Sequence, residues 1–316
     1  MLRDFYLPMP KLLFKLAALL SLFALTAMLA ACNEFTTPDE KANQPLASDL
    51  VQKIKDIDST LGAPMMMRII KSESVMEVWK QTNSGKYALL TTFKICAYSG
   101  GFGPKVIEGD RQAPEGFYDI TPALMNPNSN YYLAFNTGFP NKFDKSYGRT
   151  GANLMVHGDC SSSGCYAMTD KEIAQIFVLV REAFKGGSKA VQLEIFPFRM
   201  TPDNLAKQNG NPNMAFWQNI KRGYDSFELT REPPTWDVCN RRYVFNSTGP
   251  GGGALDANAA CPALSSDPTL TAELTAKETA DDAAFVAAVK AAGGTLAPTT
   301  AAAPIVVPMK APAERG

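Results

Sequence analysis

The hydrophobic pattern of residues 49–245 alternates short apolar runs with polar turns. The runs "VMEVWK" and "KYALLTTFKI" flank Asn83-Ser84-Gly85, and this arrangement predicts a β-hairpin. The shorter runs "YYLAF" and "NLMV", and later "AVQLEIFPF", predict buried strands, because each is too short for a typical helix and is bounded by polar or small residues.

One longer segment, "TDKEIAQIFVLVREAFKGG", has the period of an amphipathic helix. Thr169 is followed three residues later by Glu172, which is the sequence signature of a capping box. A Gly-Gly pair at 186–187 ends the pattern. The apolar positions that form one stripe are Ile173, Ile176, Phe177, Val180 and Phe184. Strands and packed helices together predict a single, mainly β domain of the α+β class over residues 49–245.

The first residues, 1–31, have the features of a bacterial lipoprotein signal peptide. Basic residues precede an apolar run at 16–30, which is shorter than the roughly 20 residues that a bilayer span requires. The run ends in "LAAC", which resembles a lipobox and predicts lipidation of Cys32. Asn33 follows where an aspartate would favour inner-membrane retention. We therefore expect a periplasmic protein anchored by lipid, at the outer membrane rather than the inner.

The remaining end segments differ in composition from the predicted domain. Residues 32–48 are polar and aperiodic, which predicts a disordered tether. Residues 246–316 are rich in Ala, Pro and Gly and are expected to form a low-complexity tail with one helix in "AELTAKETADDAAFVAAVKAAGG". A partner-binding role for this tail is an alternative source of function.

Charge and cysteine content narrow the classes of partner and compartment. Lys and Arg number 31, as do Asp and Glu, so no net charge favours nucleic acid as a partner. The cysteines are Cys32, Cys96, Cys160, Cys165, Cys239 and Cys261. If Cys32 carries lipid, an odd number remains in an oxidising compartment, and at least one is a free thiol or bridges to another chain.

The stretch "LMVHGDCSSSGCYAMTD" holds the candidate chemistry. His157, the only histidine, ends an apolar run, and Cys165 lies eight residues later, before the capped helix. A neighbouring imidazole can hold the reactive thiolate and later return the proton to a leaving amine. Backbone N–H groups of Ser163, Gly164 and Cys165 are candidates for stabilising an oxyanion. This set of groups suits acyl transfer through a thioester.

Other readings of the same residues remain open from the sequence. A lone histidine near a cysteine is often structural. A zinc site formed by His157, Cys160 and Cys165 lacks a fourth ligand and any CxxC spacing. A disulfide between Cys160 and Cys165 would consume the candidate nucleophile. "CSSSG" does not match the G-x-S-x-G elbow of serine hydrolases.

The motif His157-Gly158 followed by Ser163-x-Cys165 resembles the signature of the YkuD-type L,D-transpeptidases, and "HGDCSSSGCYAMTD" is similar to their YafK-like branch. Supporting blocks are "GPKVIEGDRQAPEGFYDI", "AFNTGFPNKFDKSYGRTGANLMVHGDC" and "IFPFRMT". The resemblance covers residues from about 60 to 245. It implies a β-rich catalytic domain that uses neither cofactor nor metal.

The resemblance also implies roles for particular residues. Cys165 would be the nucleophile, His157 the proton donor and acceptor, and the Gly158 carbonyl the group that orients the imidazole. The candidate contacts to substrate carboxylates and to the substrate groove are Arg149, Arg199, Tyr147 and Tyr166. Disulfides Cys96–Cys160 and Cys239–Cys261 would leave Cys165 free, although the sequence does not decide these pairings.

Members of this family attack the amide that follows meso-diaminopimelate in a peptidoglycan stem peptide. An amine acceptor would make the chain an L,D-transpeptidase, whereas water would make it an amidase that releases a wall-bound lipoprotein. Many members have a histidine where Ser163 stands, and Arg or Asn where Ala167 stands, so the acceptor stays open. A non-catalytic peptidoglycan-binding lipoprotein is the alternative of another class.

Overall fold

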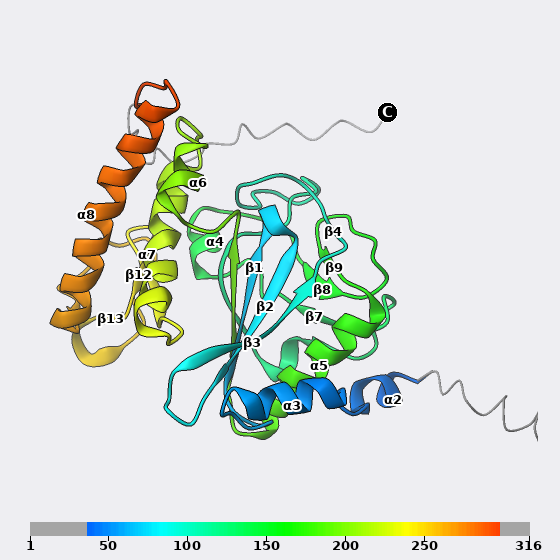
Figure 1. Cartoon of the computed structure of the whole chain (residues 1–316). Helices are drawn as coiled ribbons and strands as arrows, with labels where there is room; N and C mark the ends of the chain where they lie inside the picture. Colours follow the sequence, from blue (N-terminus) through cyan, green and yellow to red (C-terminus); the bar gives the residue numbers. More distant parts are fainter. Residues whose placement is uncertain (1–36, 298–316) are drawn as a thin grey trace, which may run out of the picture.

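The computed structural model describes residues 37–297, which contain two five-stranded sheets (Figure 1). The first sheet, in spatial order, consists of β3 (Tyr87–Lys94), β2 (Val75–Gln81), β1 (Met65–Ile70), β10 (Val191–Phe196) and β5 (Gly116–Ile120). The second consists of β4 (Ala97–Tyr98), β9 (Tyr166–Ala167), β8 (Met155–His157), β7 (Ala134–Asn136) and β6 (Met125–Asn126). Two small pairs complete the strands: β11 (Trp236–Cys239) with β12 (Arg242–Phe245), and β13 (Ser247–Thr248) with β14 (Ser265–Ser266).

The strands predicted from the sequence are present. β2 and β3 form the antiparallel hairpin, and β7, β8 and β10 occupy the three other apolar runs. β10 pairs with β1 in parallel and with β5 in antiparallel orientation, so the first sheet is mixed. A parallel pair needs a long crossover. The chain between β1 and β10 contains β2, β3 and β5, all strands of the second sheet, and the helices at Lys142–Ser146 and Asp170–Lys185.

The helix predicted from the 3.6-residue period is α5 (Asp170–Lys185). Thr169 is its N-cap, and the reciprocal bonds with Glu172 form the predicted capping box. The other helices are α2 (Pro38–Asn43), α3 (Ser48–Asp56), α4 (Lys142–Ser146), α6 (Pro202–Ala206), α7 (Met214–Thr230) and α8 (Pro268–Ala291), with short 3-10 turns at Lys71–Glu73, Pro122–Leu124 and Pro250–Gly252. The α+β class is confirmed, and more residues lie in helices than in strands.

The central strands β1 and β10 of the first sheet are covered on both faces. Successive side chains of a strand point to opposite sides, so each strand contributes to two cores. Met67 and Ile69 of β1 face a core that includes α5 and the second sheet. Ile70 of β1 and Phe196 of β10 face a separate core formed with α7. Each fully buried side chain of this size contributes about 1.5–3 kcal/mol. The central strands of the first sheet therefore lie between two apolar cores, one of which also holds the second sheet that carries His157.

The structure corrects the prediction of an aperiodic tether through residue 48. α2 begins after Thr37, which forms a capping box with Glu40. Arg181 of α5 donates hydrogen bonds to the carbonyl oxygens of Ala42 and Gln44. The segment from residue 37 onward is therefore held against the domain. The predicted signal peptide and Cys32 lie outside the described residues.

The structure also corrects the domain boundary predicted at residue 245. The expected helix is present as α8, but it packs on α7 and α6 and is not part of a detached tail (Figure 1). Leu274 and Val289 of α8 are buried, and Lys221 of α7 forms an ion pair with Asp281. A disulfide between Cys239 and Cys261 joins the two sides of the boundary. Residues 246–297 therefore belong to the same folded unit.

Within residues 37–297, none of the helices combines the length and the apolar character that a membrane crossing requires.

Candidate active site

Parallel pairing of β8 with β9 brings His157 and Cys165 together. The register sets Val156 opposite Tyr166 and His157 opposite Ala167. Cys165 directly precedes β9, and its Sγ lies 3.4 Å from the backbone nitrogen of Met155, which donates a hydrogen bond to it. The sulfur of Cys165 therefore lies against the backbone of β8, the strand that ends in His157.

The orientation of His157 fixes which of its nitrogens is the base. Nδ1 lies 2.6 Å from the carbonyl oxygen of Gly158. A carbonyl oxygen can only accept, so Nδ1 carries the hydrogen and Nε2 keeps its lone pair. The Tyr131 ring lies over the imidazole with 4.6 Å between ring centroids, and His157 itself is buried. The geometry is the one that the resemblance implies for Gly158 as the orienting group.

Cys165 is a free, half-buried thiol. Burial raises its pKa above the ordinary value, while the Met155 N–H and the charge of Lys105 act in the opposite direction. The Sγ atom also lies 3.8 Å from the carbonyl oxygen of Asn153. Because the net shift is upward, the resting group is a protonated thiol at neutral pH, and attack on an acyl carbon requires a base.

Gly158 is held where no side chain fits. A Cβ at this position would lie 2.4 Å from Oδ1 of Asp170 and 2.9 Å from the carbonyl oxygen of Tyr131. Its N–H donates to the carbonyl oxygens of Tyr131 and Leu133, at 3.0 and 3.2 Å. These close contacts fix the carbonyl that orients His157.

A disulfide ties the loop before Cys165 to the edge of the second sheet. Cys96 and Cys160 are bridged, and their backbone N–H groups donate to the carbonyl oxygens of Ala167 and Met168, respectively. This bridge excludes the alternative Cys160–Cys165 disulfide. It also removes Cys160 from the alternative zinc site, and no group of three or more potential metal ligands is found among residues 37–297.

The loop around the predicted oxyanion donors is braced internally. The Ser162 hydroxyl donates to the carbonyl oxygen of Cys165 at 2.7 Å, and the Gly164 N–H donates to the Ser162 Oγ at 3.3 Å. In this structure the Gly164 N–H thus already has an acceptor. The assignment of Ser163, Gly164 and Cys165 as oxyanion donors stays a prediction.

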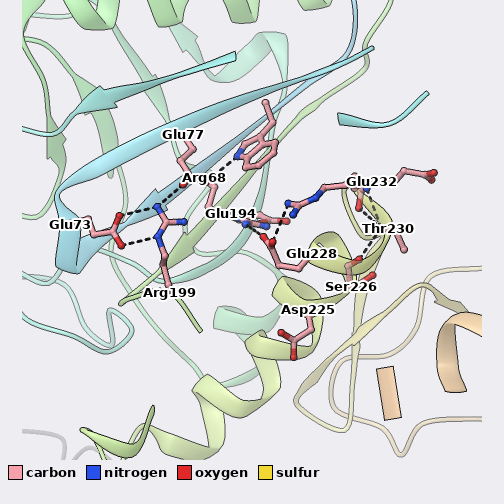
Figure 2. A network of polar contacts seen from close by, with 12 residues as sticks. Arg68, Glu73, Glu77, Glu194, Arg199, Asp225, Ser226, Glu228, Thr230 and Glu232 are labelled. Carbon is pink, nitrogen blue, oxygen red and sulfur yellow. Dashed lines mark hydrogen bonds and ion pairs between the residues drawn. The ribbon is translucent and has the colours of Figure 1, made fainter. Parts of the chain in front are cut away.

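The two arginines expected to bind substrate form internal ion pairs. Nη1 of Arg149 lies 2.7 Å from Oδ1 of Asp144, and both side chains are buried. Arg199 binds Glu73 through two hydrogen bonds of 2.9 Å and also contacts Glu77 (Figure 2). Both guanidinium groups therefore already form ion pairs within the protein, and their role in substrate binding stays a prediction.

The network around Arg199 continues beneath α7, on the face of the first sheet opposite the second sheet. Arg68 of β1 lies between Glu194 of β10 and Glu228 of α7, at 2.9 and 2.7 Å (Figure 2). Arg68 pairs in register with Glu77 on β2 and with Glu194 on β10, so three charged residues form a row across three strands. This cluster braces α7 against the sheet.

The two tyrosines expected in the groove also make internal contacts. Tyr166 is fully buried, and its hydroxyl donates to the carbonyl oxygen of Pro114 at 2.8 Å. Tyr147 packs on Phe143 with 4.9 Å between ring centroids. The structure thus joins His157 to Gly158 and sets Cys165 against the same strand, whereas the other four candidates make contacts within the protein.

Two residues beside the site were missed from the sequence. Tyr131 covers His157, and Lys105 acts on Cys165 through its charge. Both residues lie in loops, where the sequence has no hydrophobic period that would indicate which way a side chain points. "GPKVIEGD" contributed only to the resemblance, and no spacing in the sequence singled out its lysine.

An α+β domain with a free cysteine beside a histidine of fixed tautomer has the groups of a cysteine acyl-transfer enzyme. The chain is 43% identical over 210 residues to "Putative L,D-transpeptidase YafK" of Escherichia coli strain K12, and equally so to that of strain O157:H7. The match covers 66% of this chain and 82% of each relative. The chain therefore belongs to the YafK family of L,D-transpeptidase-type proteins.

Similarity to solved structures is weaker. The helical cell shape determining protein Pgp2 from Campylobacter jejuni is 20% identical, with a TM-score of 0.34 and coverage of 61% of this chain and 82% of that one. Bd1075 from Bdellovibrio bacteriovorus is 24% identical, with a TM-score of 0.32 and coverage of 45% and 51%. No protein-family model matches the chain.

Proposed function

We propose that this chain is a cysteine acyltransferase of the L,D-transpeptidase type that acts on peptidoglycan stem peptides. The observation that carries the proposal is a free Cys165 whose sulfur lies against the strand that ends in His157, with Nδ1 of this histidine held by the Gly158 carbonyl. Membership of the YafK family supports the choice of substrate. The bond attacked would be the amide that follows meso-diaminopimelate.

The first half-reaction transfers an acyl group to sulfur. Nε2 of His157 takes the thiol proton as Sγ of Cys165 bonds to the carbonyl carbon of the amide. When the tetrahedral intermediate collapses, the C–N bond breaks and the leaving amine takes the proton from Nε2. The product is a thioester on Cys165, and His157 is neutral again.

The second half-reaction decides between the two enzymatic alternatives. An incoming amine bonds to the thioester carbon and gives a proton to Nε2, the C–S bond breaks, and the sulfur regains its proton. The result is a cross-link. Water in place of the amine gives a free carboxylate and makes the chain an amidase, with a wall-bound lipoprotein as a candidate substrate.

The substrate class sets the expected location. Stem peptides lie outside the cytoplasmic membrane, which agrees with the export signal expected in residues 1–31 and with lipidation at Cys32. Anchoring at the outer membrane is part of the same proposal.

The test uses purified full-length protein incubated with disaccharide-tetrapeptide muropeptides, with and without an amine acceptor, followed by mass spectrometry. We expect Cys165→Ala to abolish product, and His157→Gln to lower the rate by about 10²–10⁴. Ser161→Ala is the matched control, because Ser161 is exposed on the same loop and its hydroxyl donates a long hydrogen bond of 3.5 Å to Asp159.

Each outcome discriminates between the alternatives. A Cys165-dependent product that joins donor to acceptor identifies a transpeptidase, and a Cys165-dependent tripeptide alone identifies a hydrolase. Product formation that survives Cys165→Ala would overturn the mechanism. Binding of stem peptide without turnover would favour the non-catalytic peptidoglycan-binding lipoprotein.

A further inference from the structure

Lys105 is a buried cation in the loop that precedes β5. Its side chain is 4% exposed, and its Nζ donates to the Ile107 carbonyl oxygen at 2.9 Å and to Oδ1 of Asp110. An ammonium group has three N–H donors. Among residues 37–297, Nζ of Lys105 has these two acceptors. The third N–H of the ammonium group is therefore available.

The loop that carries Lys105 is joined to the segment that contacts the Cys165 sulfur. Thr150 N–H donates to the Val106 carbonyl oxygen at 3.1 Å, and Glu108 N–H donates to Thr150 Oγ1 at 3.1 Å. Cε of Lys105 lies 2.8 Å from the point that a Cβ at Gly151 would occupy. The lysine side chain therefore lies directly against the backbone of this segment.

The same segment holds the sulfur from its other end. The carbonyl oxygen of Asn153 lies 3.8 Å from Sγ of Cys165, and the N–H of Met155 donates to Sγ at 3.4 Å. Five consecutive residues, 151–155, thus touch the lysine stem at one end and the thiol at the other.

The start of the Lys105 loop is fixed by a second buried lysine. Nζ of Lys71 donates to the carbonyl oxygens of Gly101, Gly103 and Ala113 and to the carboxylate of Glu115. These hydrogen bonds hold the backbone of the loop in place. The position of Lys105 is therefore set by the protein itself, without a bound substrate.

We propose that Lys105 is a positioning residue that stabilises the Cys165 thiolate through its charge, and that Asp110 moderates this effect. The inference rests on the proposed role of Cys165 as the nucleophile. A cation near an ionisable thiol favours the charged form, and the effect is larger in a site shielded from water. The Lys105 charge indeed acts to lower the pKa of Cys165, against the larger effect of burial.

The titratable groups around the thiol come from three segments. His157 ends β8, whose Met155 contacts the sulfur, Tyr131 lies over His157, and Lys105 with Asp110 belongs to the loop that packs on Gly151. Burial would raise the pKa of Asp110, but the hydrogen bond from Lys105 and three backbone N–H donors outweigh it and lower the pKa. Asp110 is therefore a carboxylate at neutral pH, and it offsets part of the lysine charge.

The experiment measures the rate of Cys165 alkylation by iodoacetamide as a function of pH. Full-length protein with its disulfides intact is used, and mass spectrometry of the peptide that contains Cys165 separates this site from every other cysteine. Lys105→Met removes the cation, and Asp110→Asn removes the opposing anion at nearly constant size. The double variant and Ser161→Ala serve as controls.

We expect the two single variants to shift the alkylation midpoint in opposite directions. Lys105→Met should raise it by about 0.5–1 pH unit, which corresponds to roughly three- to tenfold slower alkylation at pH 7. Asp110→Asn should lower it, and the double variant, which lacks both opposing charges, should fall between the two single variants. Ser161→Ala should leave the midpoint unchanged.

A purely structural role predicts a different result, because either variant would loosen the same loop and shift the midpoint in the same direction. That outcome, or no shift in either variant, overturns the proposal. If Lys105→Met does not fold, Asp110→Asn alone decides: a lowered midpoint supports the proposal, and an unchanged or raised one overturns it. Alkylation needs no peptidoglycan, so failure of the proposed function would be recognised separately by the muropeptide assay.

Discussion

The clearest test of the site geometry is the substitution Gly158→Ala. A Cβ here would lie 2.4 Å from Oδ1 of Asp170, 2.9 Å from the Tyr131 carbonyl oxygen and 3.1 Å from Cβ of Tyr132. The Asp170 side chain can turn away, but it then stops accepting the hydrogen bond of 2.9 Å from the Asp159 N–H, at a cost of about 1.5–3 kcal/mol.

The Tyr131 carbonyl cannot turn away in the same manner, because it accepts the hydrogen bond of 3.0 Å from the Gly158 N–H itself. Overpacking of this kind costs about 1–3 kcal/mol. We therefore expect Gly158→Ala to lower the free energy of unfolding by about 2.5–6 kcal/mol. It should also slow turnover, because the carbonyl that orients His157 and the Tyr131 ring above it move together.

Urea denaturation followed by circular dichroism measures the loss of stability, and the muropeptide assay measures the loss of rate. Gly101→Ala is the matched control, since a Cβ there meets no atom within 4 Å. This control should be neutral or slightly stabilising, because alanine restricts the unfolded chain more than glycine does. If Gly158→Ala were as stable and as active as the control, the steric argument would be refuted.

Three further expectations concern stability. Burial raises the pKa of Glu194 to about 7, although Arg68 opposes the shift, so the folded protein binds more protons than the unfolded chain between about pH 4.5 and 7. Stability should therefore fall by at most about 3 kcal/mol as pH rises through this window, and urea titrations of Glu194→Gln should lack that slope. Replacing both Cys96 and Cys160 by alanine removes a disulfide and should lower the free energy of unfolding by about 2–4 kcal/mol. An unchanged urea midpoint would contradict this expectation. Leu274→Ala should lower the free energy of unfolding by about 2–4 kcal/mol in the same assay, because Leu274 is buried. An unchanged free energy of unfolding would mean that the packing of Leu274 does not stabilise the domain.

Local sequence patterns were sufficient for the elements whose cause is local. α5 follows from a capping box and one apolar stripe, and the β2–β3 hairpin follows from two apolar runs around a turn. α7 was not predicted, although it is long and mostly buried. Its apolar residues are interspersed with Lys221 and Asp225. These two residues form an ion pair with each other, and Lys221 forms another with Asp281 of α8. A helix of this kind has no clear polar face to read.

The two end segments were misjudged for a related reason. Residues 38–43 have a composition typical of a tether, yet they form a helix, and the helix expected at 268–291 packs on the domain although its composition is typical of a tail. α2 depends on acceptors that it offers to Arg181 of α5, and α8 depends on partners in α7. Composition estimates how much apolar surface a segment can bury by itself, but it contains no information about charged partners far along the chain.

By itself, the sequence singled out His157 and Cys165 as candidates for base and nucleophile, because the chain has a single histidine and few cysteines. Only the tertiary structure decided how these groups are held. The register of β8 with β9 sets the Cys165 sulfur against the strand that ends in His157, and the Gly158 carbonyl fixes the tautomer. The structure also placed Lys105 against the segment that contacts the thiol, and it paired Arg149 and Arg199 with internal carboxylates. Electrostatic partners are set by distance in space, which a linear pattern of residues does not contain.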